Sequence, residues 1–365
     1  MAKTLRSTRS PNLPIAPVDY AQVYQDQFSN ALRLYFEQID NYTSVLMANS
    51  GGRFVSFPYI TANDTSDQRD GSTTIPYAMR FNTVEFSNGI SIESRDFVGI
   101  GGISSTTLTI TSVTSGRMYP ANLLSGVGVT AGTYSYLQLS STATPIAGTQ
   151  TFVSGGASGT NSFVVSGGNN LIEVRQFVSG TGVPANTRVT AVSYDSGTGN
   201  TTVTLGANFS TQAAGTYVFR PWGYQGTYSV SPSQTVSAGT TITATLPSKI
   251  TFEYAGIYNI QFSAQLTNTD GQIHDVDIWF KQNDVDISNS NSIYSVTASH
   301  GGVDGHMIAA LNLFVEVQAG DYVEIVWHTS NSAVYLDTVP AQVSPVRPES
   351  PSVILTVAFV SELSE

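Results

Sequence analysis

The 365-residue sequence contains no cysteine, which excludes disulfide bonds, a thiolate nucleophile and a cysteine-based zinc site. Charged residues make up only 11% of the chain, and 26 acidic against 15 basic residues give a net charge of −11. Only three lysines occur, at Lys3, Lys249 and Lys281. Because a nucleic-acid groove needs clustered basic side chains that displace counterions, we expect no nucleic-acid partner.

Long apolar runs are also missing. The run "VILTVAFV" (353–360) near the end of the chain has eight residues, far fewer than the roughly 20 that span a bilayer. The basic residues of "MAKTLRSTRSPNLP" are not followed by an apolar segment, so a secretory signal is not expected. The sequence thus predicts a soluble protein without membrane insertion.

Glycine and aromatic residues are plentiful instead, with 32 Gly, 18 Tyr and 17 Phe. Together with abundant serine and threonine, these residues are typical of β-strands that are separated by tight turns. From residue 226 onward, stretches such as "DVDIWFKQNDVDI" and "LFVEVQAGDYVEIVWHT" alternate apolar and polar residues around glycine turns. We therefore expect a mainly β protein built on an antiparallel sandwich.

One segment has a helical pattern instead. Residues 1–17 resemble a flexible arm, and residues 18–52 are predicted to form a single amphipathic α-helix. Its apolar stripe contains Tyr20, Tyr24, Phe28, Ala31, Tyr35, Ile39, Tyr42 and Leu46. Such a stripe needs a cover, either the β-domain of the same chain or, through self-association or docking, a larger assembly.

The segment 97–225 is rich in Gly, Ser and Thr and repeats itself. "LLSGVGVTAGT" (123–133) aligns with "FVSGTGVPANT" (177–187), and each copy is followed by a similar closing stretch, "AGTQTF" (147–152) and "AGTYVF" (214–219). We interpret this segment as a tandem pair of small β-modules.

The sandwich stretches carry a resemblance to a known family. "FEYAGIYNIQFSAQ", "IWFKQNDVDI", "FVEVQAGDYVEIVW" and "PSVILTVAFVS" resemble the jelly-roll of the C1q/TNF superfamily, and more closely the C1q-like domain of bacteriophage structural proteins, including phages of marine cyanobacteria. The opening "NLPIAPVDYAQVYQDQFSNALRLYFEQIDN" is similar to the N-terminal segment of such proteins. In them, segments similar to 64–94 and 248–265 are contiguous. The resemblance therefore implies a discontinuous jelly-roll, 54–96 plus 226–361, with 97–225 inserted.

C1q-like jelly-rolls assemble as trimers through aromatic and aliphatic side chains on one sheet, so the resemblance implies a homotrimer. The residues from which core and trimer wall would be drawn are Tyr258, Phe262, Trp279, Phe314, Tyr322 and Trp327. Of these, Tyr258, Phe262 and Trp327 join the helix stripe as interface candidates, with ordinary core packing as the alternative. The opening helices would then bundle on the trimer axis or attach the protein to a virion.

The sequence offers little for catalysis. Asp275 with Asp277, and Asp284 with Asp286, are carboxylate pairs of the kind that glycosidases use, but alternation on an exposed strand explains them. His274 beside these aspartates has no dedicated calcium-loop pattern around it. A G-x-S-x-G nucleophile elbow, a P-loop and a Rossmann fingerprint are absent from the sequence. We expect no enzyme, no cofactor and no metal site.

These observations predict a non-enzymatic homotrimeric phage virion protein, a tail fibre or tail-tip component that contributes to host-surface recognition. The alternatives are a capsid decoration or cement protein and, less favoured, a polysaccharide depolymerase. The expected partners are further copies of the chain, other virion proteins through the N-terminal arm and helix, and a host cell-surface glycan or protein. The expected location is the virion, after assembly in the host cytoplasm.

Overall fold

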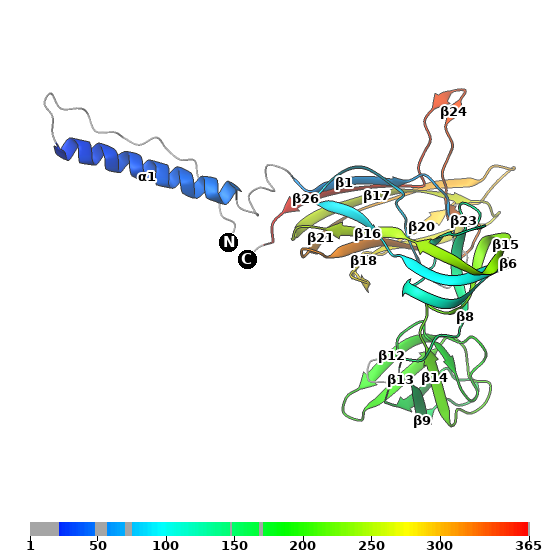
Figure 1. Cartoon of the computed structure of the whole chain (residues 1–365). Coiled ribbons are helices and arrows are strands. Elements are labelled where there is room, and N and C mark those ends of the chain that lie inside the picture. Colours follow the sequence, from blue (N-terminus) through cyan, green and yellow to red (C-terminus); the bar gives the residue numbers. More distant parts are fainter. Residues whose placement is uncertain (1–21, 48–56, 70–74, 147, 168–170, 364–365) are drawn as a thin grey trace.

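The computed structural model describes residues 22–47, 57–69, 75–146, 148–167 and 171–363. The predicted mainly β class is confirmed: one helix, α1 (Gln22–Met47), precedes antiparallel sheets that make up the rest of the described chain. Figure 1 shows a flattened sandwich, with α1 on one side and smaller β-modules at the other end.

The sandwich consists of two seven-stranded sheets. Sheet A has the order β2-β23-β17-β26-β1-β4, and β21 pairs with the free side of β17. Its strands are β1 (Tyr59–Asp64), β2 (Gln68–Arg69), β4 (Thr83–Asn88), β17 (Gly256–Asn268), β21 (Gly305–Val317), β23 (Val334–Leu336) and β26 (Val353–Ser361).

Sheet B has the order β19-β18-β22-β16-β5, with β20 also on β18 and β3 also on β22. Its strands are β3 (Tyr77–Ala78), β5 (Ile90–Ser94), β16 (Pro247–Phe252), β18 (His274–Gln282), β19 (Val285–Asp286), β20 (Ser292–Val296) and β22 (Tyr322–Thr329). The main strands thus run β1-β26-β17-β21 in one layer and β16-β22-β18-β20 in the other. If these eight strands are renumbered 1 to 8 in chain order, the layers read 1-8-3-6 and 2-7-4-5. This is the strand order of a jelly-roll.

The core of the jelly-roll joins residues from both ends of the sequence. Ile60, Ala62 and Phe81 pack in one buried cluster with side chains between Leu246 and Phe359. Alternation along the strands builds this core, since every second side chain of β17 and β26 points inward. The jelly-roll is therefore assembled from segments that flank a long insertion.

The first inserted unit, module 1, contains β6 (Phe97–Gly116), β7 (Leu123–Ser125), β8 (Tyr134–Ser141) and β15 (Gly226–Thr245). Strand β6 folds back on itself near Ser105, whose φ is +59°, so that the Thr111 hydroxyl donates to the Ile100 carbonyl over 3.1 Å. Gly101 lies so close to the Thr109 carbonyl that a Cβ would stand 2.4 Å from it, which explains the glycine. Across module 1 the stretches adjoin in the order β7, 234–245, 97–104, 107–116, 226–231, β8.

Module 2 lies within module 1, between β8 and β15. Its sheet has the order β11-β14-β9-β10-β13-β12. The strands are β9 (Thr149–Gly155), β10 (Ser162–Ser166), β11 (Phe177–Ser179), β12 (Val189–Asp195), β13 (Asn200–Leu205) and β14 (Thr216–Arg220). Each module has a separate buried cluster, around Phe97 and Ile242 in module 1 and around Phe163 and Phe219 in module 2.

The two modules share one design. The Leu124 amide donates to the Thr133 carbonyl (2.7 Å), and 54 residues later the Val178 amide donates to the Thr187 carbonyl (3.0 Å). The strand order of module 2 also matches that of module 1, position by position. The structure therefore shows a repeated unit whose second copy is nested in the first.

This nesting corrects two details of the sequence interpretation. The stretch 147–152 does not close the first copy, because β9 is the first strand of module 2 and pairs with β14. The boundary at 226 also differs, because Tyr228, Val230 and Ile242 of β15 belong to the buried cluster of module 1. The chain returns to the jelly-roll core at Leu246, about 20 residues later.

Candidate interaction surfaces

Helix α1 places six predicted stripe residues on one face. Tyr24, Phe28, Ala31, Tyr35, Ile39 and Tyr42 are half-buried, whereas most other side chains of the helix are exposed. Tyr20 lies outside the described residues, and Leu46 lies in the helix at a position whose side chain the structure does not describe. Among the described strands, none makes an extended packing contact with α1, which stands apart from the sandwich in Figure 1.

Three of the predicted interface residues are placed elsewhere. The side chains of Tyr258, Phe262 and Trp327 are 0%, 3% and 1% exposed in the single chain and belong to the jelly-roll core. Their assignment to an oligomer interface was therefore wrong, and the core alternative holds. All three side chains point toward the opposite sheet. Alternation shows which residues share a face of a strand, but it does not show which of the two faces is covered.

Phe314 of the same sequence set lies on the outer face of sheet A, where it is 61% exposed. Strand pairing arranges that face in three rows: Tyr59–Ala358–Asn259–Phe314, Phe86–Thr61–Thr356–Gln261–Asn312 and Asn63–Ile354–Ser263–Ala310. None of these thirteen residues is charged. We call this surface the uncharged face.

Large apolar side chains border the uncharged face on both sides. Phe86 is 65% exposed on β4, and Ile308 is 60% exposed on β21, six residues before Phe314 on the same side of that strand. Apolar side chains that gather on one sheet face, in a chain with few charges there, are typical of a surface that another protein covers. The sequence could not reveal the face, because its rows combine segments up to about 300 residues apart.

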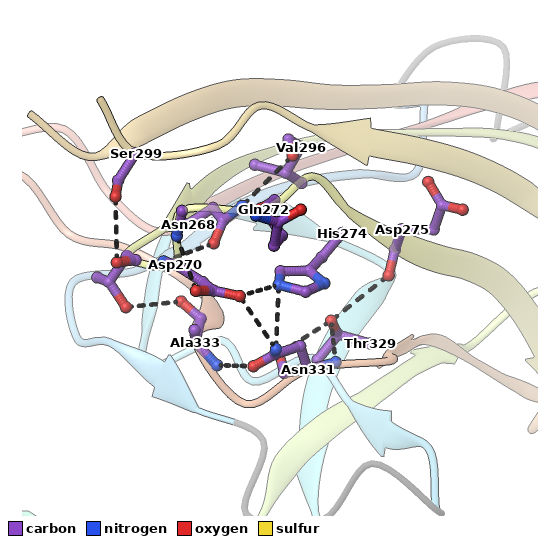
Figure 2. Close-up of polar contacts among 12 residues, drawn as sticks. Asn268, Asp270, Gln272, His274, Asp275, Val296, Ser299, Thr329, Asn331 and Ala333 are labelled. Carbon is purple, nitrogen blue, oxygen red and sulfur yellow. Dashed lines mark hydrogen bonds and ion pairs between the residues drawn. The ribbon is translucent and has the colours of Figure 1, made fainter. Parts of the chain in front are cut away.

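A polar cluster lies at one end of the jelly-roll (Figure 2). The His274 ring nitrogen Nε2 lies 2.6 Å from the Asp270 carboxylate and 3.0 Å from the Asn331 amide nitrogen. The hydrogen bond with His274 holds the pKa of Asp270 below its ordinary value. Asn331 also accepts from the Ala333 amide over 2.9 Å. The cluster joins the loop after β17 to the loop after β22, which is a bracing role.

The sequence-predicted carboxylate pairs are engaged in separate structural contacts. Asp275 accepts from Ser295 (2.6 Å), and Asp277 accepts from Asn291 (3.0 Å). Asp284 bonds Arg95, while Asp286 accepts from the Trp279 indole over 2.7 Å. Within the described part of the chain, no group of three or more His, Asp or Glu side chains is arranged to hold a metal ion.

A buried ionic junction connects the jelly-roll to the modules. Arg95 donates to Glu324 through Nε (2.9 Å) and Nη2 (2.6 Å), and its Nη2 lies 2.5 Å from Asp284. Burial alone would lower the pKa of Arg95, but hydrogen bonding and the charge of Glu324 raise it, so the group stays cationic. The guanidinium also lies over the ring of Tyr119, which is in the connection between β6 and β7 of module 1.

The junction continues into both modules through Trp222. Tyr119 meets its ring edge-on at 5.2 Å, and the guanidinium groups of Arg117 and Arg175 lie over the indole at 4.6 and 5.1 Å. These contacts join the two modules to each other, and the contact of Arg95 with Tyr119 joins them to the sandwich. Sequence reasoning missed Arg95 because its partner Glu324 is 229 residues away and no motif links them.

Comparisons with known proteins add little. No protein-family model matches the chain, and no curated protein matches it. Among solved structures, the insecticidal delta-endotoxin Cry8Ea1 from Bacillus thuringiensis aligns at 8% identity with a TM-score of 0.18. The alignment covers 83% of this chain, which spans about half (53%) of that protein. So low a score carries no argument about fold or function. Of the described helices, none is long and apolar enough to cross a membrane.

Proposed function

We propose that this chain is a non-enzymatic homotrimeric structural protein of a phage virion, a tail fibre or tail-tip component that presents its modules to the host surface. The single observation that carries the proposal is the uncharged face of sheet A. The resemblance of the jelly-roll stretches to C1q-like phage domains adds the virion context.

Charge favours contact between copies through this face. Each chain has a net charge of −11, so two copies repel each other as whole molecules. The thirteen residues of the uncharged face carry no charge of their own, and the carboxylates of Glu85, which accepts from Asn63 over 2.8 Å, and Glu316 lie at its margins. Phe86 and Phe314 give the face apolar borders. In this arrangement the apolar border of one copy packs against the uncharged face of the next copy. Such a head-to-tail contact can close into a ring. A ring of three is the size expected for a C1q-like jelly-roll.

The helix agrees with the same arrangement. Helix α1 precedes β1 in the chain, and Tyr59 at the start of β1 lies in the first row of the uncharged face. Three helices would therefore enter a trimer near its axis, where the stripe from Tyr24 to Tyr42 can be covered by the same stripe of two other copies.

The modules are suited to the recognition role. In Figure 1 module 2 hangs below the sandwich, on the side away from α1. A trimer would present three copies of each module on one rigid body, so that weak individual contacts add through effective concentration. Because module 2 is inserted between β8 and β15 of module 1, it extends farther from the sandwich than module 1 does.

Immunogold electron microscopy tests the proposal. A gold-labelled antibody against the full chain is applied to purified particles of a phage whose genome encodes it. Label at the tail tip is the expected result. Label spread over the capsid would favour the decoration protein instead, and particles without label would overturn a virion role.

A further inference from the structure

A β-hairpin projects from the jelly-roll between β23 and β26. It contains β24 (Gln342–Val343) and β25 (Val346–Arg347), and we call residues 337–350 the arm. Its base is closed by two backbone hydrogen bonds between Val339 and Ser350, of 3.0 and 2.8 Å, and is tied to sheet A by the Thr338 amide, which donates to Asp67 just before β2 over 3.1 Å. The arm therefore has a fixed root in the sheet that carries the uncharged face.

The tip of the arm is apolar and exposed to an unusual degree. Val343 is 90% exposed and Val346 is 86% exposed, among the most exposed large apolar side chains of the described chain. Residues 340–346 include no charged side chain. A two-stranded hairpin without a core is marginal in water, so an arm with two bare valines at its tip gains stability when another surface covers it.

The direction of the arm identifies that surface. Both strands that flank the arm belong to sheet A, and in Figure 1 the arm rises from the layer of β1, β26 and β17, away from β16, β18 and the modules. It therefore stands on the side of the sandwich where the uncharged face lies. A partner that covers the face comes within reach of the tip.

We infer that the arm is a clasp between copies of this chain, with Val343 and Val346 packed on the uncharged face of a neighbouring copy. The inference rests on the proposed trimer and deepens it. An uncharged apolar tip matches a sheet face whose thirteen row residues carry no charge. The continuity of the arm with sheet A makes a second copy the occupant.

Photo-crosslinking from the tip tests the inference in the full-length protein. Because the chain has no cysteine, the substitution Val343→Cys provides one attachment point for a thiol-reactive benzophenone. The control is Val127→Cys in module 1, which is 88% exposed and belongs to an unrelated surface. Equal amounts of unlabelled and ¹⁵N-labelled protein are mixed, reassembled and irradiated, and the joined peptides are identified by mass spectrometry.

The expected result is mixed-isotope crosslinks from position 343 to peptides of β1, β17, β21 or β26, with few or none from position 127. A trimer by native mass whose crosslinks stay within one chain would overturn the clasp and leave the trimer standing. A monomer by native mass would overturn both.

The double variant Val343→Ser/Val346→Ser gives an independent readout. Its far-ultraviolet spectrum should be unchanged, while its trimers dissociate at higher concentration, on the order of tenfold for each valine. Unchanged dissociation would contradict the clasp.

Discussion

Truncation of Phe314 separates the assembly of the protein from its folding. Full burial of a phenylalanine side chain contributes about 1.5–3 kcal/mol. In the single chain 61% of Phe314 remains exposed, so a covering copy would add about 1–2 kcal/mol for each chain. In Phe314→Ala the three copies together lose about 3–6 kcal/mol of trimer stability, at least a hundredfold in the trimer equilibrium. The fold of each chain should be nearly unaffected, because the side chain lies outside the core.

Sedimentation over a dilution series measures the trimer equilibrium, and thermal melting of the same samples monitors folding. Val127→Ala is the control, since this side chain is 88% exposed and lies in module 1, away from sheet A. If Phe314→Ala and Val127→Ala dissociate at the same concentration, the assignment of the uncharged face as the interface is refuted.

Three further outcomes are expected. Deletion of residues 22–47 should weaken trimers while the sandwich still melts cooperatively; unchanged trimers would mean that α1 has another role. Phe163→Ala should destabilise module 2 by about 3–5 kcal/mol, because this ring is 1% exposed and its centroid lies 4.7 Å from that of Tyr217. In calorimetry, the unfolding temperature of the jelly-roll should not change. Burial opposes ionisation of Asp284, but the charge of Arg95, together with hydrogen bonds from Tyr322 and Arg95, outweighs burial and keeps the pKa of Asp284 below the ordinary 3.8. A lowered carboxyl pKa stabilises the fold above pH 3.8, so this contribution should fade as the pH falls below 3.8, and Asp284→Asn should lose that part of the pH dependence.

Local patterns predicted the elements of this protein well. Apolar spacing identified α1, period-two alternation identified β18, and a continuous apolar run marked β26, since each signal lies within one short segment. The repeat at 123–133 and 177–187 was visible because its turns need the same residue types at the same spacing. These features depend on neighbours in the sequence.

Long-range arrangement limited the rest. The nesting of module 2 became visible only through strand pairing, because "AGTQTF" fits equally well as an end and as a beginning. The candidate Tyr258 was placed at an interface although it is core, whereas Phe314, which has a similar local pattern, lies outside. Which face of a strand is covered depends on the second sheet, and no short stretch of sequence carries that information.

The native mass of the full-length protein tests the central claim most directly. Native mass spectrometry at micromolar concentration should give about three times the chain mass of 38.8 kDa. A stable species of one chain mass would contradict the trimer and the interpretation of the uncharged face as its interface.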